Sequence, residues 1–171
     1  KVDGCCIRSM WNGMCFDFGG KTDNAMMSVT LMKKLHEIFR AAKVLDGMIE
    51  FFKDKPVCFY GEGYGAKIQK MGSSYLKDGV DFVCFDIKIG EIFLRRDDVA
   101  EICNKLGIKK VPVIFNGTIQ EAIDLVSDGF ESTWGKFEAE GLVGRTLVDM
   151  RDRMGHRVIT KIKTRDFKNG K

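Results

Sequence analysis

Apolar and polar positions alternate at strand-like spacing in several stretches of the 171-residue chain. Residues 4–18 form two such stretches around Asn12-Gly13, a dipeptide typical of two-residue hairpin turns. Residues 80–89 alternate in the same way and carry β-branched and aromatic side chains, and residues 92–94 are expected to pair with them. These stretches predict antiparallel strands.

Helical spacing of apolar residues appears in three other places. Residues 28–53 predict either one long helix or a pair of helices, with Gly47 as a possible interruption. A further helix is expected over 97–106 and is ended by Gly107. A capping box at residues 118–121 predicts the start of another helix.

The remaining apolar runs are short and read as strands. Residues 57–60 predict a strand that runs into a Gly-rich turn over 61–65. Residues 111–115 predict a buried strand, and 141–148 and 157–164 predict the last two strands. Strands outnumber helices and hairpins dominate, so we expect an α+β fold of antiparallel sheets flanked by helices, within one domain.

Composition is that of an ordinary globular protein and adds a prediction about compartment. Hydrophobic residues make up 44% and charged residues 30% of the chain, and there is no membrane-length apolar run and no visible signal segment. The six cysteines contain no C-x-x-C pair, which favours free thiols. We therefore expect a cytoplasmic or other reducing intracellular compartment, without secretion or membrane binding.

Positive charge gathers at the C-terminal end, although the net charge is only +4. The basic residues there are Arg145, Arg151, Arg153, Arg157, Lys161, Lys163, Arg165, Lys168 and Lys171. The opposing acids are Asp149, Asp152 and Asp166. Such a stretch favours a polyanionic partner, and a solvated surface is the commoner alternative.

The first four residues, Lys1-Val2-Asp3-Gly4, read K-x-D-G, a motif that some enzymes use to attach a nucleotide to a lysine. A lysine nucleophile must be neutral, so its pKa of about 10.4 has to be lowered by nearby positive charge or by burial. Lys161 and Lys163 would share one face of a strand and could supply that charge, balanced by a nucleotide phosphate. An edge strand with outward lysines is the alternative.

Four other residues could bind a nucleotide. Glu140 could serve as a Mg²⁺ ligand or could be a surface acid. Glu62, set among the glycines of 61–65, could hydrogen-bond a sugar hydroxyl or lie in a flexible turn. Phe85 could stack on a purine or belong to the core, and Asp86 in an apolar strand needs a partner.

Together these segments resemble the motifs of the covalent nucleotidyltransferases, which include polynucleotide ligases and mRNA-capping guanylyltransferases. Residues 1–4 look like motif I, 61–65 like motif III, 82–87 like motif IIIa, 140–144 like motif IV and 161–163 like motif V. Within this superfamily the chain is most similar to ATP-dependent RNA ligases of phage RNA repair and trypanosome RNA editing. The resemblance implies their ATP-grasp-like nucleotidyltransferase fold.

Two departures from the superfamily bear on this assignment. RNA ligases usually carry arginine where Lys21 stands, and lysine is a point charge that cannot form arginine's bidentate fork. DNA ligases and capping enzymes usually carry arginine at the position of Cys6, where this chain instead has Arg8 two residues later. This second departure weakens the interpretation as a DNA ligase or capping-type domain without excluding it, so that domain stays the enzymatic alternative. A non-catalytic nucleotide- or RNA-binding relative is the other alternative.

The resemblance implies a three-step reaction. Lys1 attacks the α-phosphate of ATP and becomes lysyl-AMP, the AMP passes to a 5′-phosphate on RNA, and a 3′-hydroxyl displaces it to seal the strand. The implied catalytic residues are Lys1, Lys161 and Lys163, and Glu140 is the implied ligand of Mg²⁺, with Mn²⁺ as the alternative metal. The implied nucleotide-binding residues are Lys1, Val2, Asp3, Lys21, Glu62, Phe85, Asp86, Glu140, Lys161 and Lys163.

More detailed roles follow from the same resemblance. Glu62 is expected to bind the ribose, Phe85 to stack on adenine, and Asp3 with the Val2 backbone to hold the nucleotide beside Lys1. The basic C-terminal residues are expected to help hold RNA. We further expect a monomer, and an adenylyltransferase domain over residues 1–171 that lacks flanking segments.

Overall fold

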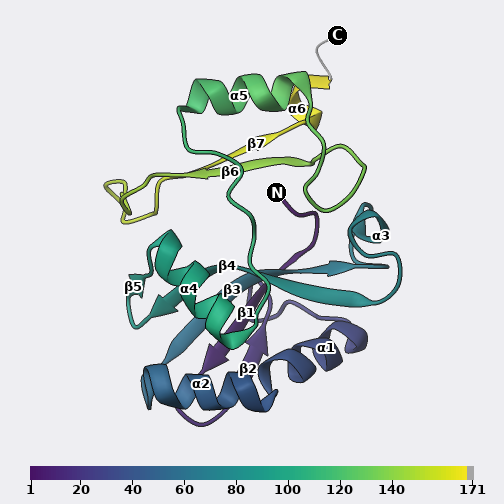
Figure 1. Ribbon diagram of the computed structural model, residues 1–171. Coiled ribbons are helices and arrows are strands. Elements are labelled where there is room, and N and C mark those ends of the chain that lie inside the picture. The colour runs from purple at the N-terminus through teal and green to yellow at the C-terminus, as the bar shows by residue number, and fades with distance from the viewer. Residues whose placement is uncertain (169–171) are drawn as a thin grey trace. The chain divides into compact units, whose positions relative to one another are not determined.

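The computed structural model describes residues 1–168, which divide into two compact units (Figure 1). The N-terminal unit is Asp3–Val111, and the C-terminal unit joins Lys1–Val2 to the segment from Pro112 onward. Lys171, one of the basic residues named above, lies outside the described residues. No helix within residues 1–168 is both long and apolar enough to cross a membrane.

A five-stranded antiparallel sheet forms the centre of the N-terminal unit, with the strand order β2-β1-β3-β4-β5. Its strands are β1 (Cys5–Trp11), β2 (Phe16–Gly19), β3 (Val57–Gly65), β4 (Val80–Ile89) and β5 (Ile92–Phe93). The predicted hairpin is confirmed, because Asn12 Oδ1 accepts hydrogen bonds from the amides of Met14 and Cys15 while Gly13 has a φ of 101°. The antiparallel sheet agrees with the predicted α+β fold.

The helices of this unit are α1 (Val29–Phe39), α2 (Ala42–Phe52), α3 (Gly72–Tyr75) and α4 (Arg96–Leu106). The predicted break between α1 and α2 falls at residues 40–41 and not at Gly47, which is buried inside α2. A side chain at Gly47 would clash with Leu106, so this glycine serves close packing and not helix termination. Gly107 ends α4 with a φ of 74°, as expected.

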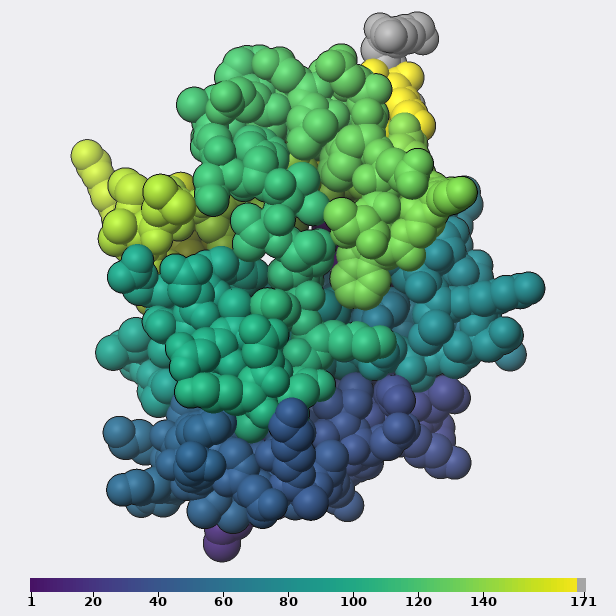
Figure 2. Space-filling view, viewed as in Figure 1, coloured from purple at the N-terminus to yellow at the C-terminus, as the bar shows by residue number. Residues whose placement is uncertain are grey.

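The C-terminal unit consists of a two-stranded antiparallel ribbon and two helices. These elements are α5 (Ile119–Asp128), β6 (Gly141–Arg145), β7 (Ile159–Lys163) and α6 (Arg165–Lys168). The predicted capping box is present, since Thr118 caps α5 and Glu121 hydrogen-bonds back to Thr118. Residues 146–158 connect the two strands and project from the surface of this unit, in yellow-green in Figure 2.

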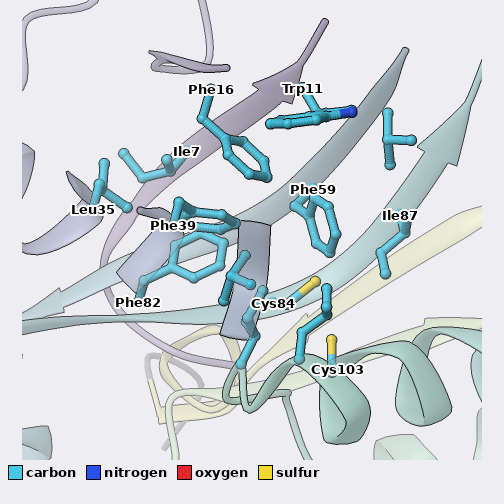
Figure 3. Packing of buried hydrophobic residues seen from close by; sticks show 14 of the residues in the cluster. Ile7, Trp11, Phe16, Leu35, Phe39, Phe59, Phe82, Cys84, Ile87 and Cys103 are labelled. Carbon is cyan, nitrogen blue, oxygen red and sulfur yellow. The ribbon is translucent and has the colours of Figure 1, made fainter. Parts of the chain in front are cut away.

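Each unit has a hydrophobic core of its own. In the N-terminal unit, Phe39 of α1 packs against Phe59 and Phe82 of the sheet at centroid distances of 5.7 and 5.3 Å (Figure 3). In the C-terminal unit the core is small and joins α5 to the ribbon through Val126, Leu142 and Ile162. The side of the ribbon that carries Leu142 and Ile162 is thus covered by α5.

Two sequence predictions about strands are wrong. Residues 61–65 were expected to form a turn but continue β3 to Gly65. Residues 111–115 were expected to form a buried strand, yet pairing there ends after a single bridge between Lys110 and Cys84, and residues 113–115 are exposed. Pro112 has no N–H group to continue the ladder, which explains why the apolar run does not become a strand.

Candidate active site

Lys1 is held by a carboxylate that lies 139 residues away in the chain. Its Nζ lies 2.7 Å from both oxygens of Glu140 and 3.3 Å from the carbonyl oxygen of Val2. The two side chains of this ion pair are 19% and 21% exposed, so each stays accessible to a ligand. The structure therefore brings the predicted nucleophile and the predicted metal ligand into direct contact.

The ribbon fixes the backbone on both sides of Gly141. The backbone nitrogen of Lys1 donates to the carbonyl oxygen of Gly141 at 2.5 Å, and Gly141 pairs with Lys163 across the β6–β7 ladder. Gly141 has a φ of 140°, and a Cβ atom there would clash with the carbonyl oxygen of Ile162. Only glycine therefore allows β7 to pass this close to the start of β6, directly after Glu140.

Lys161 and Lys163 lie on one face of β7, as their spacing predicted. Ile162 between them is 8% exposed and packs into the small core on the opposite face. Within residues 1–168 neither lysine side chain makes a hydrogen bond or an ion pair. Two unpaired ammonium groups on one face suit a phosphate ligand, which would offset their mutual repulsion.

Thr164, which sequence analysis missed, fixes the backbone of the Glu140 segment. Its hydroxyl donates to the carbonyl oxygen of Ala139 at 2.7 Å and its amide donates to that of Glu140 at 3.0 Å. The side chain is only 5% exposed. A threonine directly after a Lys-x-Lys strand was the available signal, although nothing in the sequence indicated its burial.

In the N-terminal unit, Gly4 and Asp3 fix the start of the chain against β3 and α3. A side chain at Gly4 would clash with Gly63 and with Glu62, so the glycine of K-x-D-G permits close approach to β3. Asp3 accepts a hydrogen bond from the amide of Met71 at 3.3 Å, and its own amide donates to the Tyr75 hydroxyl at 3.2 Å. Asp3 therefore has a structural role beside the predicted nucleotide contact.

The predicted ribose and base residues belong to neighbouring strands. Glu62 on β3 is half-buried and pairs across the ladder with Cys6 of β1. Asp86 on β4 is 4% exposed and pairs with Tyr60, while Phe85 falls at an irregularity in the β3–β4 register. Their contacts with a nucleotide stay predictions.

Lys21 lies in the exposed turn after β2 and makes no hydrogen bond or ion pair with residues 1–168. The side chain that orders this turn is Arg8, whose Nε donates to the carbonyl oxygen of Gly20 at 2.8 Å. Arg8 also pairs with Asp23 at 2.7 Å, which raises the pKa of its guanidinium. Arg8 therefore anchors the loop that carries Lys21.

Burial suppresses ionisation of tyrosine and cysteine side chains on the central strands β3 and β4. It raises the pKa of Tyr60 to about 12, with the Cys58 thiol as the next cause. Burial also raises the pKa of the thiols of Cys58 and Cys84. All six cysteines are free, as expected, although Cys15 is exposed. Tyr60, Cys58 and Cys84 therefore stay protonated near neutral pH, and none of these three is a candidate base.

The donor set at Glu140 fits a divalent cation that is shared with a nucleotide. Residues 1–168 contain no group of three or more His, Cys, Asp or Glu side chains that could form an all-protein metal site. Mg²⁺ in nucleotide enzymes needs only one or two carboxylates, because phosphates and waters complete its coordination. Glu140 can supply one such carboxylate.

Comparisons of sequence and structure relate this chain to known proteins. A family model described as RNA ligase matches residues 1–163. No curated protein matches the chain closely enough to count as a relative.

Solved structures of a Naegleria gruberi RNA ligase share the fold. A variant with ATP and Mn has a TM-score of 0.72 and 18% identity, and the match covers 100% of this chain and 50% of that one. The same ligase with PPi gives 0.72 and 18%, with 99% and 49% covered. The chain thus spans about half the length of these structures, and the predicted mixed fold with antiparallel sheets is confirmed.

Proposed function

The chain belongs to the RNA ligase family, and we propose on that basis that it is the adenylyltransferase part of an ATP-dependent RNA ligase. We propose that this ligase joins 5′-phosphate and 3′-hydroxyl RNA ends through a lysyl-AMP intermediate. The observation that carries the proposal is the contact of Lys1 with Glu140 and with Gly141, which pairs with Lys163 in the β6–β7 ribbon.

In the first step the neutral Nζ of Lys1 attacks the α-phosphorus of ATP. A P–N bond forms while the bond to the bridging oxygen breaks, and pyrophosphate leaves with the bonding electrons. Lys1 rests in an ion pair with Glu140, and a charged amine cannot attack. Lys1 must therefore leave this carboxylate and lose a proton before the reaction.

Lys161 and Lys163 would act on the phosphate during the same step. Two cations on one face can bind the α-phosphate and stabilise the charge that develops on its oxygens. They would also disfavour a charged amine on Lys1, in the direction that the attack needs. A divalent cation at Glu140, when bound, would supply neutralisation of the nucleotide phosphates.

The second and third steps transfer the AMP group and seal the RNA. An oxygen of the RNA 5′-phosphate attacks the lysyl-AMP phosphorus, the P–N bond breaks, and the lysine amine is recovered. The 3′-hydroxyl then attacks the activated 5′-phosphorus and AMP leaves. We propose that Glu62 binds the ribose, that Phe85 stacks on adenine, and that Val2, Asp3, Lys21 and Asp86 contribute further nucleotide contacts.

We propose that RNA binds to the basic connection between β6 and β7. Arg153 lies near its tip, is exposed, and makes no ion pair within residues 1–168. Asp149 and Asp152, which could oppose it, are engaged with Arg157 and His156. The connection can therefore present positive charge to a phosphate backbone.

We also propose a compartment and an oligomeric state. The free thiols support a reducing compartment, and we propose that the protein acts as a monomer.

The experiment is to incubate the protein with α-labelled ATP and Mg²⁺ and to look for an acid-labile phosphoramidate on the chain. Label from ATP that disappears in Lys1→Ala and persists in Lys136→Ala supports the proposal. Lys136 is a matched control because it is an exposed lysine of the same unit. Label from GTP alone would indicate a capping enzyme, and absence of label with both nucleotides would refute both enzymatic functions.

A further inference from the structure

Strand β4 contains a β-bulge at Phe85. Tyr60 of β3 pairs with Asp86, but the next residue, Gly61, pairs with Cys84, so Phe85 is the extra residue in the β3–β4 register. An extra residue of this kind bends the strand and redirects side chains, and such bulges are common beside active sites. The bulge thus falls within the segment that carries Phe85 and Asp86, two of the predicted nucleotide-binding residues.

The bulge changes which residues of β4 face the core. Before it, Phe82 and Cys84 are 1% and 0% exposed and lie in the core, and after it Ile87 is 0% exposed and lies there too (Figure 3). Without the extra residue, a side chain at position 86 would take the core-facing place. Phe85 lies half-buried outside the core because it follows core-facing Cys84, and the bulge keeps Asp86 out of the core as well.

The backbone of the bulge is held from the side opposite β3. The amide and carbonyl of Cys84 bond to Lys109 and Val111 at 2.8 and 2.9 Å. The carbonyl oxygen of Phe85 accepts a hydrogen bond from the guanidinium of Arg96 at 2.5 Å. Arg96 is the first residue of α4, so this helix is tied directly to the bulge.

A charged donor suits this position. A backbone carbonyl that leaves the regular ladder needs a partner, and hydrogen bonds from charged groups are stronger than those between neutral groups. The planar guanidinium of Arg96 also offers several donors in a fixed geometry, which a lysine ammonium does not. The neighbouring Arg95 is exposed and makes no hydrogen bond or ion pair through its side chain within residues 1–168.

We propose that Arg96 is a positioning residue for nucleotide binding, because it fixes the carbonyl of the Phe85 bulge and thereby sets the Phe85 ring for the purine. This inference rests on the proposed function. Arg96 acts through Phe85 and need not touch ATP itself. The competing explanation is that Arg96 only fastens α4 to the sheet and contributes to stability.

The test measures ATP dependence of lysine adenylylation in single turnover, together with direct ATP binding by equilibrium dialysis, on wild type, Arg96→Met, Arg96→Lys and the control Arg95→Met. Loss of a charge-assisted hydrogen bond that positions the ring should raise the KM and the Kd for ATP by about tenfold in Arg96→Met. The rate at saturating ATP should change much less. Arg96→Lys should recover part of the loss, and Arg95→Met should stay within about twofold of wild type.

A double-mutant cycle with Phe85→Ala separates positioning from stability. If Arg96 acts through Phe85, Arg96→Met should add little to the ATP-affinity loss that Phe85→Ala already causes. A full additional loss in the Phe85→Ala background would overturn the inference. So would a lowered thermal midpoint of Arg96→Met with unchanged KM and Kd, since that is the signature of a purely structural role.

Failure of the proposed function gives a different result. If the wild-type protein forms no lysyl-AMP, the ligase proposal is refuted, while the equilibrium Kd values still decide whether Arg96 positions Phe85 for ATP. If the wild type is labelled and Arg96→Met has the wild-type KM, the ligase proposal stands and only the role of Arg96 is refuted.

Discussion

One methyl group at Gly141 should disable the ribbon that carries the candidate nucleophile. The φ of 140° at Gly141 lies in a region that L-residues rarely adopt, which costs about 1–3 kcal/mol in Gly141→Ala. The new Cβ atom would also clash with the carbonyl oxygen of Ile162, so the ladder must open at the Gly141–Lys163 pair. Losing one or two backbone hydrogen bonds adds about 0.5–1.5 kcal/mol each.

These contributions sum to about 1.5–6 kcal/mol, against a typical domain stability of about 5–15 kcal/mol. Gly144→Ala is the matched control on the same strand. Gly144 has no positive φ, and its added Cβ would meet only the methyl group of Thr160, at 2.9 Å. We expect this control to cost at most about 1 kcal/mol.

Two assays on the same samples check the reasoning. Urea denaturation should give a lower free energy of unfolding for Gly141→Ala than for Gly144→Ala. Adenylylation by labelled ATP should fall far more in Gly141→Ala, because Glu140, Lys1 and Lys163 all depend on this part of the ladder. Equal stability and equal labelling of the two variants would show that the backbone at Gly141 does not position the site.

Three further outcomes are expected. Glu140→Gln should lower adenylylation by at least about tenfold while changing the free energy of unfolding by less than about 1 kcal/mol, since a partly exposed ion pair with Lys1 adds little stability; a large stability loss in denaturation would contradict this. The raised pKa of Tyr60 contributes stability below its unfolded value of about 10, which is lost as pH rises towards about 12. Denaturation at pH values across this window should therefore show a smaller alkaline loss in Tyr60→Phe, and an unchanged profile would refute the assignment. Arg153→Ala should reduce the slope of log K against log salt for single-stranded RNA by about 0.7; an unchanged slope in filter binding would exclude a phosphate contact at Arg153.

Local rules in the sequence predicted the elements that depend on near neighbours. The Asn12-Gly13 hairpin and the Thr118 capping box are determined within a few residues, so their prediction succeeded. The shared face of Lys161 and Lys163 follows from strand geometry alone. The resemblance also selected Glu140, which the structure places at Lys1.

Features that depend on a distant partner could not be predicted in this way. The glycines of β3 suggested a turn, but a side chain at Gly61 would clash with the Phe82 ring and one at Gly63 with Leu31. They permit close packing within a strand, which is visible only once α1 and β4 are in place. The bulge at Phe85 is likewise defined only relative to the register of β3.

The candidate residues depend on two departures from regular strand geometry. At Gly141 a positive φ brings the ribbon strands close together, and Thr164 holds the adjoining backbone at Glu140. At Phe85 an extra residue shifts the alternation of β4 so that Asp86 joins Phe85 outside the core, and Arg96 holds the carbonyl of Phe85. A regular strand would place a glutamate or a phenylalanine by alternation alone, whereas these departures aim particular side chains and need a dedicated partner to persist. Thr164 and Arg96 should therefore affect nucleotide chemistry more than their contribution to stability would suggest.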